Sequence, residues 1–278
     1  MTTAAKYSAA LSDAEAREFV PFMHALIGAA FTVIHRHFLE ATTVITKADA
    51  TPVTQADRGA EQAMRGLIEA RYPCHGVLGE EFGIRDAAGD VPRYRWVLDP
   101  VDGTRAFISN CFLFGTLIAL ERDDGAGFRP VLGSIAHPAA GLALIGHAGE
   151  CRLYSADGTE RRVRVRACSS LADATVLATT HWSTREQAGG PAVEQVIRRA
   201  KLYRTWGDCF GYFAIATGGA DVMLDPTLSY WDVAAIVPVI EGAGGRVTSW
   251  HGGNPLEQPS LIATSGALHD EVLHTLAA

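Results

Sequence analysis

The segment Asp99–Thr104, with the sequence Asp-Pro-Val-Asp-Gly-Thr, constrains the fold of this chain more than any other segment. It follows Val97 and Leu98, two apolar residues that are typical of the end of a buried strand. Pro100 favours an extended conformation in the residue before it, and Gly103 permits a tight bend behind it. The sequence therefore predicts a strand that ends in a rigid corner.

The corner aims two carboxylates, those of Asp99 and Asp102, at one point. Carboxylates are hard oxygen ligands, and together with the backbone carbonyl of Val101 they suit Mg²⁺ or Mn²⁺. An ordinary turn is the alternative, because Asp-Pro and Asp-Gly pairs are both common turn signals. The corner by itself leaves both interpretations open.

The composition limits the classes of protein to which the chain can belong. Of its 278 residues 48% are hydrophobic and 20% are charged, as in a globular protein that buries a sizeable core. The net charge is −7 and no basic stretch carries interleaved aromatic residues, so the sequence argues against a nucleic-acid partner. An acidic protein that handles an anionic substrate needs bound cations, which agrees with the metal interpretation.

The cysteines and the first residues give an expectation for the cellular location. Five scattered cysteines without a Cys-x-x-Cys pair argue against a disulfide framework and structural zinc. Residues 1–20 do not resemble a signal peptide, and the longest apolar run, Ala25–Ile34, is too short to span a bilayer. We therefore expect a cytoplasmic protein with no membrane partner.

Hydrophobic spacing predicts two helices followed by a strand-rich middle. The first helix opens with the capping box at Ser12 and is expected to run to about Glu40. The second is expected over Thr54–Arg71, with Thr54 as its cap. The strands that follow are expected at 75–78, 94–98, 114–121, 131–137, 141–147 and 162–166.

After about residue 170 the pattern changes to alternating strands and helices. Strands are expected at 175–179, 202–205, 222–225, 246–249 and 260–264, and helices at 191–199, 209–217, 231–241 and 269–276. The first half thus predicts two helices on a mostly antiparallel sheet, and the second half a layered α/β arrangement. We expect one domain over 1–278, with subdomains of about 1–150 and 151–278.

Three further acidic residues are candidate ligands, although each has a plain alternative. Glu80 follows a short strand and could belong to a surface turn. Asp57 and Asp232 each lie in the first turn of an expected helix, where an acid commonly interacts only with the helix dipole. Lys47 alone would be a solvated surface charge.

Four segments together resemble the inositol monophosphatase superfamily of Mg²⁺-dependent phosphomonoesterases. They are Lys…Thr-x-x-Asp at 47–57, Gly-Glu-Glu at 79–81, Trp-Val-Leu-Asp-Pro-Val-Asp-Gly-Thr at 96–104, and Trp-Asp-x-Ala-Ala…Glu-x-Ala-Gly-Gly at 231–245. The resemblance covers roughly residues 40–270. It implies an α/β fold, a layered αβαβα sandwich like that of fructose-1,6-bisphosphatase, a single catalytic domain and a homodimer.

The resemblance also implies roles for the matching residues. The metal ligands would be Glu80, Asp99, Val101, Asp102 and Asp232. Asp57 and Thr104 would form a dyad that orients the attacking water, with Glu80 as a further catalytic residue. The cofactor would be two to three Mg²⁺ ions, with Mn²⁺ as an alternative, and the partner a small phosphomonoester substrate.

Fewer residues bear on which phosphomonoester is used. The candidate substrate-binding residues are Lys47, Gly103, Thr104, Trp206, Asp208 and Asp225. The N–H groups of Gly103 and Thr104, at the start of a helix, are expected to hold phosphate oxygens. The segments 104–120, 206–212 and 225–238 resemble the histidinol-phosphatase branch of the superfamily.

Histidinol phosphate carries an ammonium group and an imidazole, whereas inositol offers only hydroxyls. The acids Asp208 and Asp225, beside Trp206 and Phe210, could hold a cation and a flat ring. In the alternative interpretation Asp208 caps the helix that follows and the aromatic residues belong to the core.

Other functions stay open on the sequence alone. An inositol- or sugar-phosphate phosphatase is the nearest alternative. A 3′-phosphoadenosine phosphatase would share the segment at 51–57, but its usual charged residue after Gly-Thr-Arg is missing. A regulatory binding protein on the same fold is disfavoured by the complete metal set.

Two further features of the sequence are interpreted as structural. Gly242–Gly245 is interpreted as a helix stop rather than a nucleotide loop, and Cys209 as a packed thiol.

Overall fold

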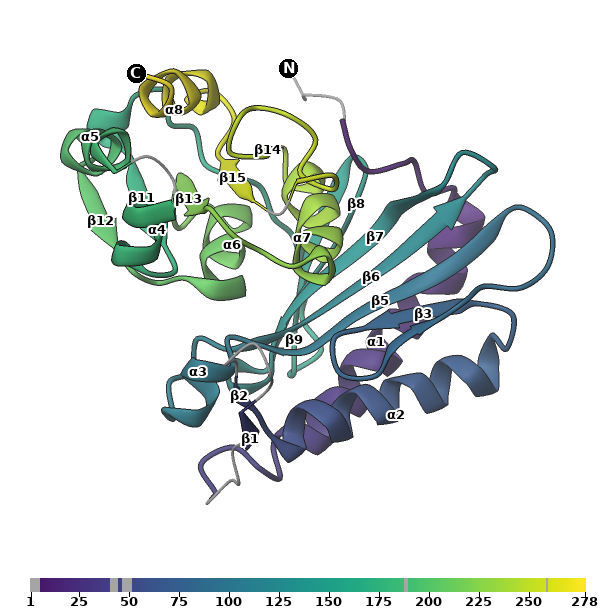
Figure 1. The fold of residues 1–278 in the computed structure, drawn as a ribbon. Coiled ribbons are helices and arrows are strands. Elements are labelled where there is room, and N and C mark those ends of the chain that lie inside the picture. Colours follow the sequence, from purple (N-terminus) through teal and green to yellow (C-terminus); the bar gives the residue numbers. More distant parts are fainter. Residues whose placement is uncertain (1–5, 41–44, 47–51, 188–189, 259) are drawn as a thin grey trace.

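Alternating layers of helices and sheets build the protein (Figure 1). The computed structural model describes residues 6–40, 45–46, 52–187, 190–258 and 260–278. Its helices are α1 (Asp13–Ile34), α2 (Gln55–Arg71), α3 (Thr104–Ile108), α4 (His181–Gln187), α5 (Pro191–Arg199), α6 (Asp208–Ala216), α7 (Tyr230–Gly242) and α8 (His269–Leu276). A two-residue pair of strands, β1 (Ile45–Thr46) and β2 (Pro52–Val53), precedes α2.

The first sheet has eight strands in the order β10-β9-β8-β7-β6-β5-β3-β4. Its pairings are antiparallel except for the parallel pair β3–β5, so the expected mostly antiparallel sheet is confirmed. The strands are β3 (Gly76–Gly79), β4 (Gly83–Arg85), β5 (Arg93–Asp102), β6 (Gly115–Asp123), β7 (Phe128–His137), β8 (Leu142–His147), β9 (Glu150–Ser155) and β10 (Glu160–Arg162).

The second sheet has five strands in the order β12-β11-β13-β15-β14, with parallel pairs β11–β12 and β11–β13. These strands are β11 (Thr175–Ala178), β12 (Leu202–Arg204), β13 (Val222–Asp225), β14 (Arg246–Thr248) and β15 (Leu261–Thr264). The alternating pattern expected after residue 170 is confirmed, and the sequence analysis missed the short helix α4.

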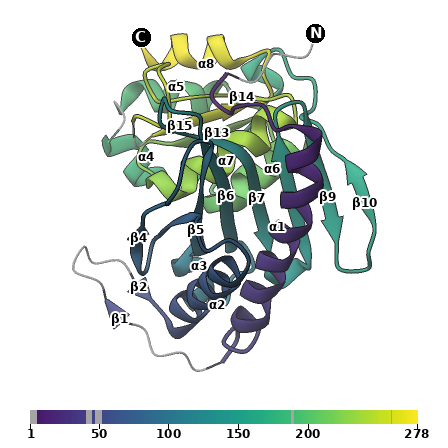
Figure 2. The same ribbon diagram turned by 90° about the vertical axis from the view of Figure 1, so that its right-hand side faces the viewer.

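Helices cover both sheets, and three apolar clusters fill the spaces between the layers. Helices α1 and α2 lie side by side on one face of the first sheet (Figure 2). Helices α6 and α7 lie between the two sheets, and α5 and α8 cover the outer face of the second sheet. This arrangement is the predicted αβαβα sandwich.

The close contact between α7 and the first sheet depends on glycine. A Cβ atom at Gly133 of β7 would lie 2.2 Å from the carbonyl oxygen of Ala235, and one at Gly146 of β8 would lie 2.5 Å from the Cα of Val239. The backbone of α7 therefore approaches the sheet more closely than a side chain there would allow.

The first sheet continues past residue 150 to Arg162, so its last two strands come from the part of the chain assigned to the second subdomain.

Two boundaries differ from the expectation. Helix α1 ends at Ile34, followed by turns in which Leu39 adopts a positive φ of 68°, rather than continuing to Glu40. The alternating segment at 162–166 is not a strand beyond Arg162. The N–H of Val165 donates instead to the carbonyl of Ala243 behind α7, so the segment links the two layers. Alternation here reflects burial of valines against that cluster, which an extended link achieves as well as a strand does.

Helix α1 also has the length and composition of a membrane-spanning helix, with 22 residues and a mean hydropathy of 1.3. Its buried residues, which include Met23, Leu26 and Ala30, pack in the cluster shared with α2 and the first sheet. Core helices of globular proteins meet the same criteria, so this helix is weak evidence for a membrane.

Candidate active site

The predicted corner is a bulge at the end of β5. Asp99 pairs with Leu117 of β6, but the next pairing joins Asp102 to Gly115, so β5 carries one extra residue between them. The Val101 N–H donates to Asp99 Oδ1 at 3.1 Å. Gly103 has the positive φ, 75°, that the predicted bend requires. The strand thus runs to Asp102, four residues beyond its expected end at Leu98.

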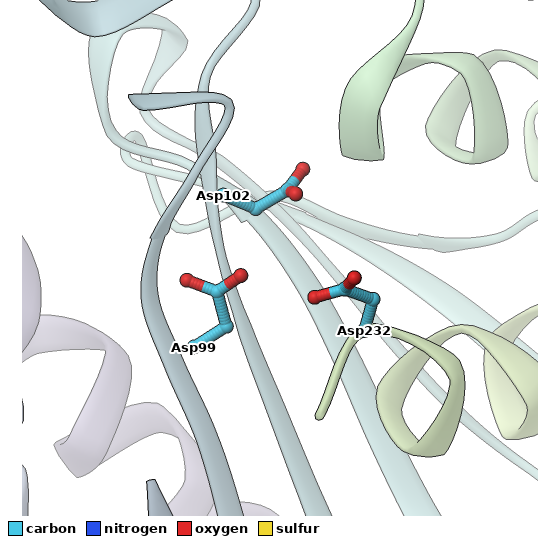
Figure 3. Close-up of side chains that lie close together, drawn as sticks. All are labelled: Asp99, Asp102 and Asp232. Carbon is cyan, nitrogen blue, oxygen red and sulfur yellow. The ribbon is translucent and has the colours of Figure 1, made fainter. Parts of the chain in front are cut away.

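Three aspartates meet at this bulge. The carboxylates of Asp99 and Asp102 on β5 face that of Asp232 at the start of α7 (Figure 3), and one oxygen of each lies within 4.8 Å of the others. Asp232 also completes the capping box of α7, because its Oδ2 accepts the N–H of Ser229 at 2.8 Å. Asp102 Oδ2 accepts the N–H of Cys209, at the start of α6, at 2.5 Å.

Burial and mutual repulsion make this aspartate cluster costly to ionise. Burial raises the pKa of Asp102 to about 7, with repulsion from Asp232 adding to the effect. Burial likewise raises the pKa of Asp232 to about 7, and the pKa of Asp99 lies well above its usual range for the same reason, with repulsion from Glu80 next. Among the described residues no lysine or arginine forms an ion pair with these three. This donor set, all oxygen and without a protein counter-charge, fits a divalent cation such as Mg²⁺.

Glu80 and Val101 line the same cavity of about 350 Å³ as the aspartate cluster. Glu80 lies just beyond β3, where its N–H donates to the carbonyl of Leu98 on β5 at 3.1 Å. The Val101 carbonyl accepts the hydroxyl of Thr104 at 3.1 Å. All five residues predicted as metal ligands therefore border one cavity.

Asp57 and Thr104, the predicted dyad, are neighbours. Thr104 Oγ1 lies 3.4 Å from Asp57 Oδ1, and the other carboxylate oxygen of Asp57 accepts the N–H and hydroxyl of Thr54 at 2.9 and 2.5 Å. Burial raises the pKa of Asp57, although the bonds from Thr54 oppose the shift. Asp57 therefore completes the capping box of α2 and also contacts Thr104, so the capping interpretation and the dyad are compatible.

A second cavity, also of about 350 Å³, adjoins the first and contains Asp208 and Asp225. Asp208 has an unusual positive φ of 48°, and its N–H donates to Thr179 Oγ1 at 2.9 Å. Burial raises the pKa of Asp208 to about 7, with repulsion from Asp102 adding and the charge of Arg105 opposing. The residue before α6 is Gly207, which makes no side-chain cap, so the interpretation of Asp208 as a helix cap is wrong.

Asp225 ends β13 and is almost completely buried. Its Oδ2 accepts the hydroxyl of Tyr212 at 2.8 Å. Burial raises its pKa to about 7, and hydrogen bonds from Thr179 oppose the shift. Thr179 follows β11 at the position next to Asp225, because Ala178 pairs with Leu224 in the parallel pair. Sequence reasoning missed Thr179, which the rule that sites form at the carboxyl ends of parallel strands could have found.

The predicted aromatic partners are not in either cavity. Trp206 is 45% exposed and lines neither, and Phe210 packs against His137 and Phe213, with ring centroids 5.6 and 6.3 Å apart. Phe210 is two residues after Asp208 on α6, so the two side chains point to different sides of the helix. The sequence analysis also missed Arg105, which lines both cavities. Lys47 lies outside the described residues.

Two interpretations of less prominent residues are confirmed. Helix α7 ends at Gly242 and Gly244 has a positive φ of 85°, so the glycine-rich segment stops a helix. Cys209 is a packed thiol, because it is 1% exposed and burial raises its pKa well above the usual range.

A sequence profile described as the inositol monophosphatase family matches residues 15–278. The chain belongs to the inositol monophosphatase family. It is 37% identical to the bifunctional phosphatase IMPL2 of Arabidopsis thaliana over 92% of this chain and 71% of that protein. It is 36% identical to the histidinol-phosphatase of Streptomyces coelicolor over 83% of this chain and 85% of that protein.

Solved structures agree with this membership. An inositol monophosphatase from Zymomonas mobilis superposes with a TM-score of 0.79 at 33% identity, covering 96% of this chain and all of that one. The protein is therefore a phosphoric monoester hydrolase of the α/β layered fold. The family is metal-dependent, generally with Mg²⁺, which agrees with the aspartate cluster.

Proposed function

We propose that this phosphatase hydrolyses L-histidinol phosphate to L-histidinol and phosphate, the phosphatase reaction of histidine biosynthesis. The observation that carries the proposal is that two acids, Asp208 and Asp225, line the cavity next to the aspartate cluster. Asp102 of the cluster lines both cavities, so the two are adjacent. The Asp208 carboxylate lies beside Gly103 of the bulge, where an added Cβ would be 3.0 Å from Asp208 Oδ2. Asp208 is half-buried, and repulsion from Asp102 acts on it together with the opposing charge of Arg105, so a cationic ligand would add favourable charge at this position.

Histidinol has the complementary groups. Its ammonium carries a fixed positive charge at neutral pH and its imidazole can gain one, so Asp208 and Asp225 can each face a donor. The similarity to the histidinol-phosphatase of Streptomyces coelicolor supports the same choice. Because Trp206 and Phe210 lie elsewhere, recognition of the imidazole is assigned to these carboxylates and not to an aromatic platform.

In the proposed site Mg²⁺ is held by Glu80, Asp99, Asp102, Asp232 and the Val101 carbonyl, with two to three ions expected and Mn²⁺ as an alternative. When bound, the metal neutralises phosphate charge and makes water more acidic, which the reaction requires. The N–H groups at Gly103 and Thr104 are expected to hold phosphate oxygens, and Lys47 to contribute to substrate binding.

Asp57 and Thr104 have the placement for handling the attacking water. The Thr104 hydroxyl has one proton, which it can donate to the Val101 carbonyl or to Asp57 Oδ1. When it donates to Asp57, its lone pairs are free to accept a hydrogen bond from water and so to orient the oxygen toward phosphorus. The water oxygen forms the new P–O bond and the ester P–O bond breaks; the proton that the water loses balances the proton that the leaving oxygen takes up. Direct attack by water is favoured because Cys209 is almost completely buried and its raised pKa keeps the thiol protonated, which makes it a poor nucleophile.

A phosphate-release assay tests the proposal. Histidinol phosphate, inositol 1-phosphate and 3′-phosphoadenosine 5′-phosphate are compared at equal concentration, with Mg²⁺ and with a chelator. We expect the highest kcat/KM for histidinol phosphate and no turnover with the chelator. A higher kcat/KM for inositol 1-phosphate would assign the protein to the inositol phosphatases instead.

Inositol 1-phosphate is the second candidate because hydroxyls as well as acids line the cavity around Asp208, including those of Thr179 and Thr227. The inositol monophosphatase from Zymomonas mobilis is 33% identical to this chain.

We also infer a homodimer, on the basis of the family resemblance, and a cytoplasmic location, on the basis of five cysteines that are free. Light scattering coupled to size exclusion would give twice the chain mass of 29.7 kDa for a dimer and the single mass for a monomer.

A further inference from the structure

Glu61 is a buried acid outside both cavities, and no motif of the sequence pointed to it. It lies on α2 four residues after Asp57, on the same face of the helix, and is completely buried. It borders neither the cavity of the aspartate cluster nor that of Asp208. A buried carboxylate that does not contact substrate needs another explanation for its position.

The Glu61 carboxylate holds the turn that carries Glu80. Its Oε2 accepts the N–H of Glu81 at 2.8 Å and its Oε1 accepts the N–H of Phe82 at 3.2 Å. These are the two residues directly after Glu80. Because a carboxylate that accepts two consecutive backbone N–H groups fixes the path of the chain, the orientation of the turn depends on Glu61.

Arg65 completes this arrangement one turn later on α2. Its Nε donates to Glu61 Oε1 at 2.7 Å, and its Nη2 donates to the carbonyl of Gly83 at the start of β4. Arg65 therefore balances the charge of Glu61 and holds the far end of the same turn. We call Glu61 and Arg65 the α2 clasp.

Gly79 shows how closely the clasp approaches the turn. A Cβ atom at this position would lie 2.0 Å from Glu61 Oε1, so only glycine fits beside the carboxylate. Gly79 directly precedes Glu80, whose own N–H is fixed by Leu98 on β5. The backbone of Glu80 is thus held between β5, which carries Asp99, and α2, which carries Asp57.

We propose that Glu61 is a positioning residue, which acts through Glu80 by holding its turn in register with the aspartate cluster and with Asp57. The inference rests on the proposed role of Glu80 as a metal ligand. Partners that orient metal ligands typically change metal affinity or activity by about 10- to 100-fold when they are removed. Glu61 belongs to this group although it contacts neither metal nor substrate.

The test compares four variants by two measurements. Glu61→Gln removes the charge and one acceptor oxygen, and Gly79→Ala places a methyl group against the Glu61 carboxylate and so separates the clasp from the turn without changing either clasp residue. Glu80→Gln removes the ligand itself, and Glu69→Gln, an exposed acid on the same helix, is the matched control. The measurements are the Mg²⁺ concentration for half-maximal phosphate release and the rise in Tm that Mg²⁺ produces without substrate.

We expect Glu61→Gln and Gly79→Ala to raise the half-saturating Mg²⁺ concentration by roughly tenfold or more and to reduce the Mg²⁺-induced rise in Tm. High Mg²⁺ should restore kcat to within a few-fold, which a merely structural defect would not allow. Glu69→Gln should match the wild type. If Glu61→Gln does not fold, Gly79→Ala decides the matter, since it keeps both charged residues of the clasp and changes only their contact with the turn.

Two outcomes separate the inference from the proposal on which it rests. If Glu80→Gln weakens the Mg²⁺ response but the folded clasp variants stay within twofold of the wild type, the positioning role of Glu61 is overturned. If Glu80→Gln itself leaves the Mg²⁺ response unchanged, the proposed role of Glu80 fails, and with it the route through which Glu61 was inferred to act.

Discussion

Buried carboxylates in this protein fall into two groups that differ in what surrounds them. Glu61, Glu121 and Glu241 each receive donors from the protein. Glu121 is paired with Arg95, with Oε2 and the Arg95 nitrogen 2.6 Å apart, and accepts the hydroxyl of Tyr230. Glu241 accepts the N–H groups of residues 6–8 at 2.8 to 2.9 Å, and so ties the start of the chain to the end of α7.

The aspartate cluster is the contrasting group. Asp99 and Asp232 are buried and Asp102 is half-buried, and the three carboxylates face one another. Burial of a charge is tolerated where hydrogen bonds and counter-charges accompany it. In the first group an arginine accompanies Glu61 and Glu121, and three backbone N–H groups and a hydroxyl accompany Glu241. Each aspartate of the cluster accepts a single backbone N–H and has no ion pair among the described residues, so we infer that the balancing positive charge comes from a bound cation. The comparison separates acids that the protein itself balances from acids that we propose bind a cation.

The largest expected effect is the loss of activity in Asp102→Asn. Removal of one ligand should reduce phosphate release by roughly 10³-fold, because charge stabilisation by a metal supplies several kcal/mol to the transition state. The same variant should raise the Tm of the metal-free protein, since one repulsive charge is gone. Full activity in a folded Asp102→Asn protein would contradict the assignment of the cluster.

Glu121→Gln should have the opposite effect on stability. Breaking a buried ion pair from one side leaves Arg95 without its partner, so the free energy of unfolding should fall by about 3 kcal/mol. Urea denaturation measures this change. Glu160→Gln is the control, because its pair with Arg152 is largely exposed and should contribute less than about 1 kcal/mol. If both substitutions lowered the free energy of unfolding equally, the assignment of Glu121 to the acids that stabilise the fold would be wrong.

Asp208→Asn tests an acid that we propose to bind the cationic part of the substrate. We expect KM for histidinol phosphate to rise roughly 10- to 100-fold, because the variant loses a charge-assisted hydrogen bond to the substrate. The Tm should change little. Inositol 1-phosphate is the control substrate, and its KM should change less than about threefold. A similar rise in KM for both substrates would assign Asp208 to the phosphate site rather than to the cation.

The smallest expected effect is a change in the pH dependence of stability, and it comes from a buried base, His269. His269 is completely buried, its ring nitrogens contact the hydroxyls of Thr248 and Thr264 at 3.0 and 2.9 Å, and burial lowers its pKa to about 4, with the charge of Arg246 next. Asp270 and Lys6 are the other charged groups that face it, and Asp270 opposes the shift.

Because the unfolded chain binds this proton at a pKa near 6.5 and the folded chain only near 4, stability should fall as the pH decreases from 6.5 to 4. The decrease is at most about 1.4 kcal/mol per pH unit from this group. Thermal unfolding across this window should show a shallower slope in His269→Gln. An unchanged slope would mean that His269 does not titrate as its burial requires.

The sequence was sufficient for the features that depend on local chemistry. Pro100 and Gly103 predicted the corner, Thr54 predicted the start of α2, and the order of segments indicated the family. It failed where tertiary contacts decide the outcome. The alternating residues at 162–166 form a link between layers, and Phe210 turns toward His137 rather than toward Asp208.

Glu61 is a residue whose proposed role could not be predicted from the sequence. Its only signal in the sequence is a spacing of four residues from Asp57 on a buried helix face, which many structural residues share. The fact that its carboxylate contacts the turn of Glu80 depends on the packing of α2 against the edge of the first sheet. Residues that position ligands from a distance are therefore found only once the fold is known.

Calorimetric titration of Mg²⁺ into the protein tests the central claim most directly, namely that the aspartate cluster is a cation site. The wild type and the charge-matched control Glu160→Gln should bind Mg²⁺ with equal affinity at neutral pH and release protons on binding, because ligands with raised pKa values must ionise. Asp102→Asn should bind it at least tenfold more weakly. Equal Mg²⁺ affinity in all three proteins would contradict the account.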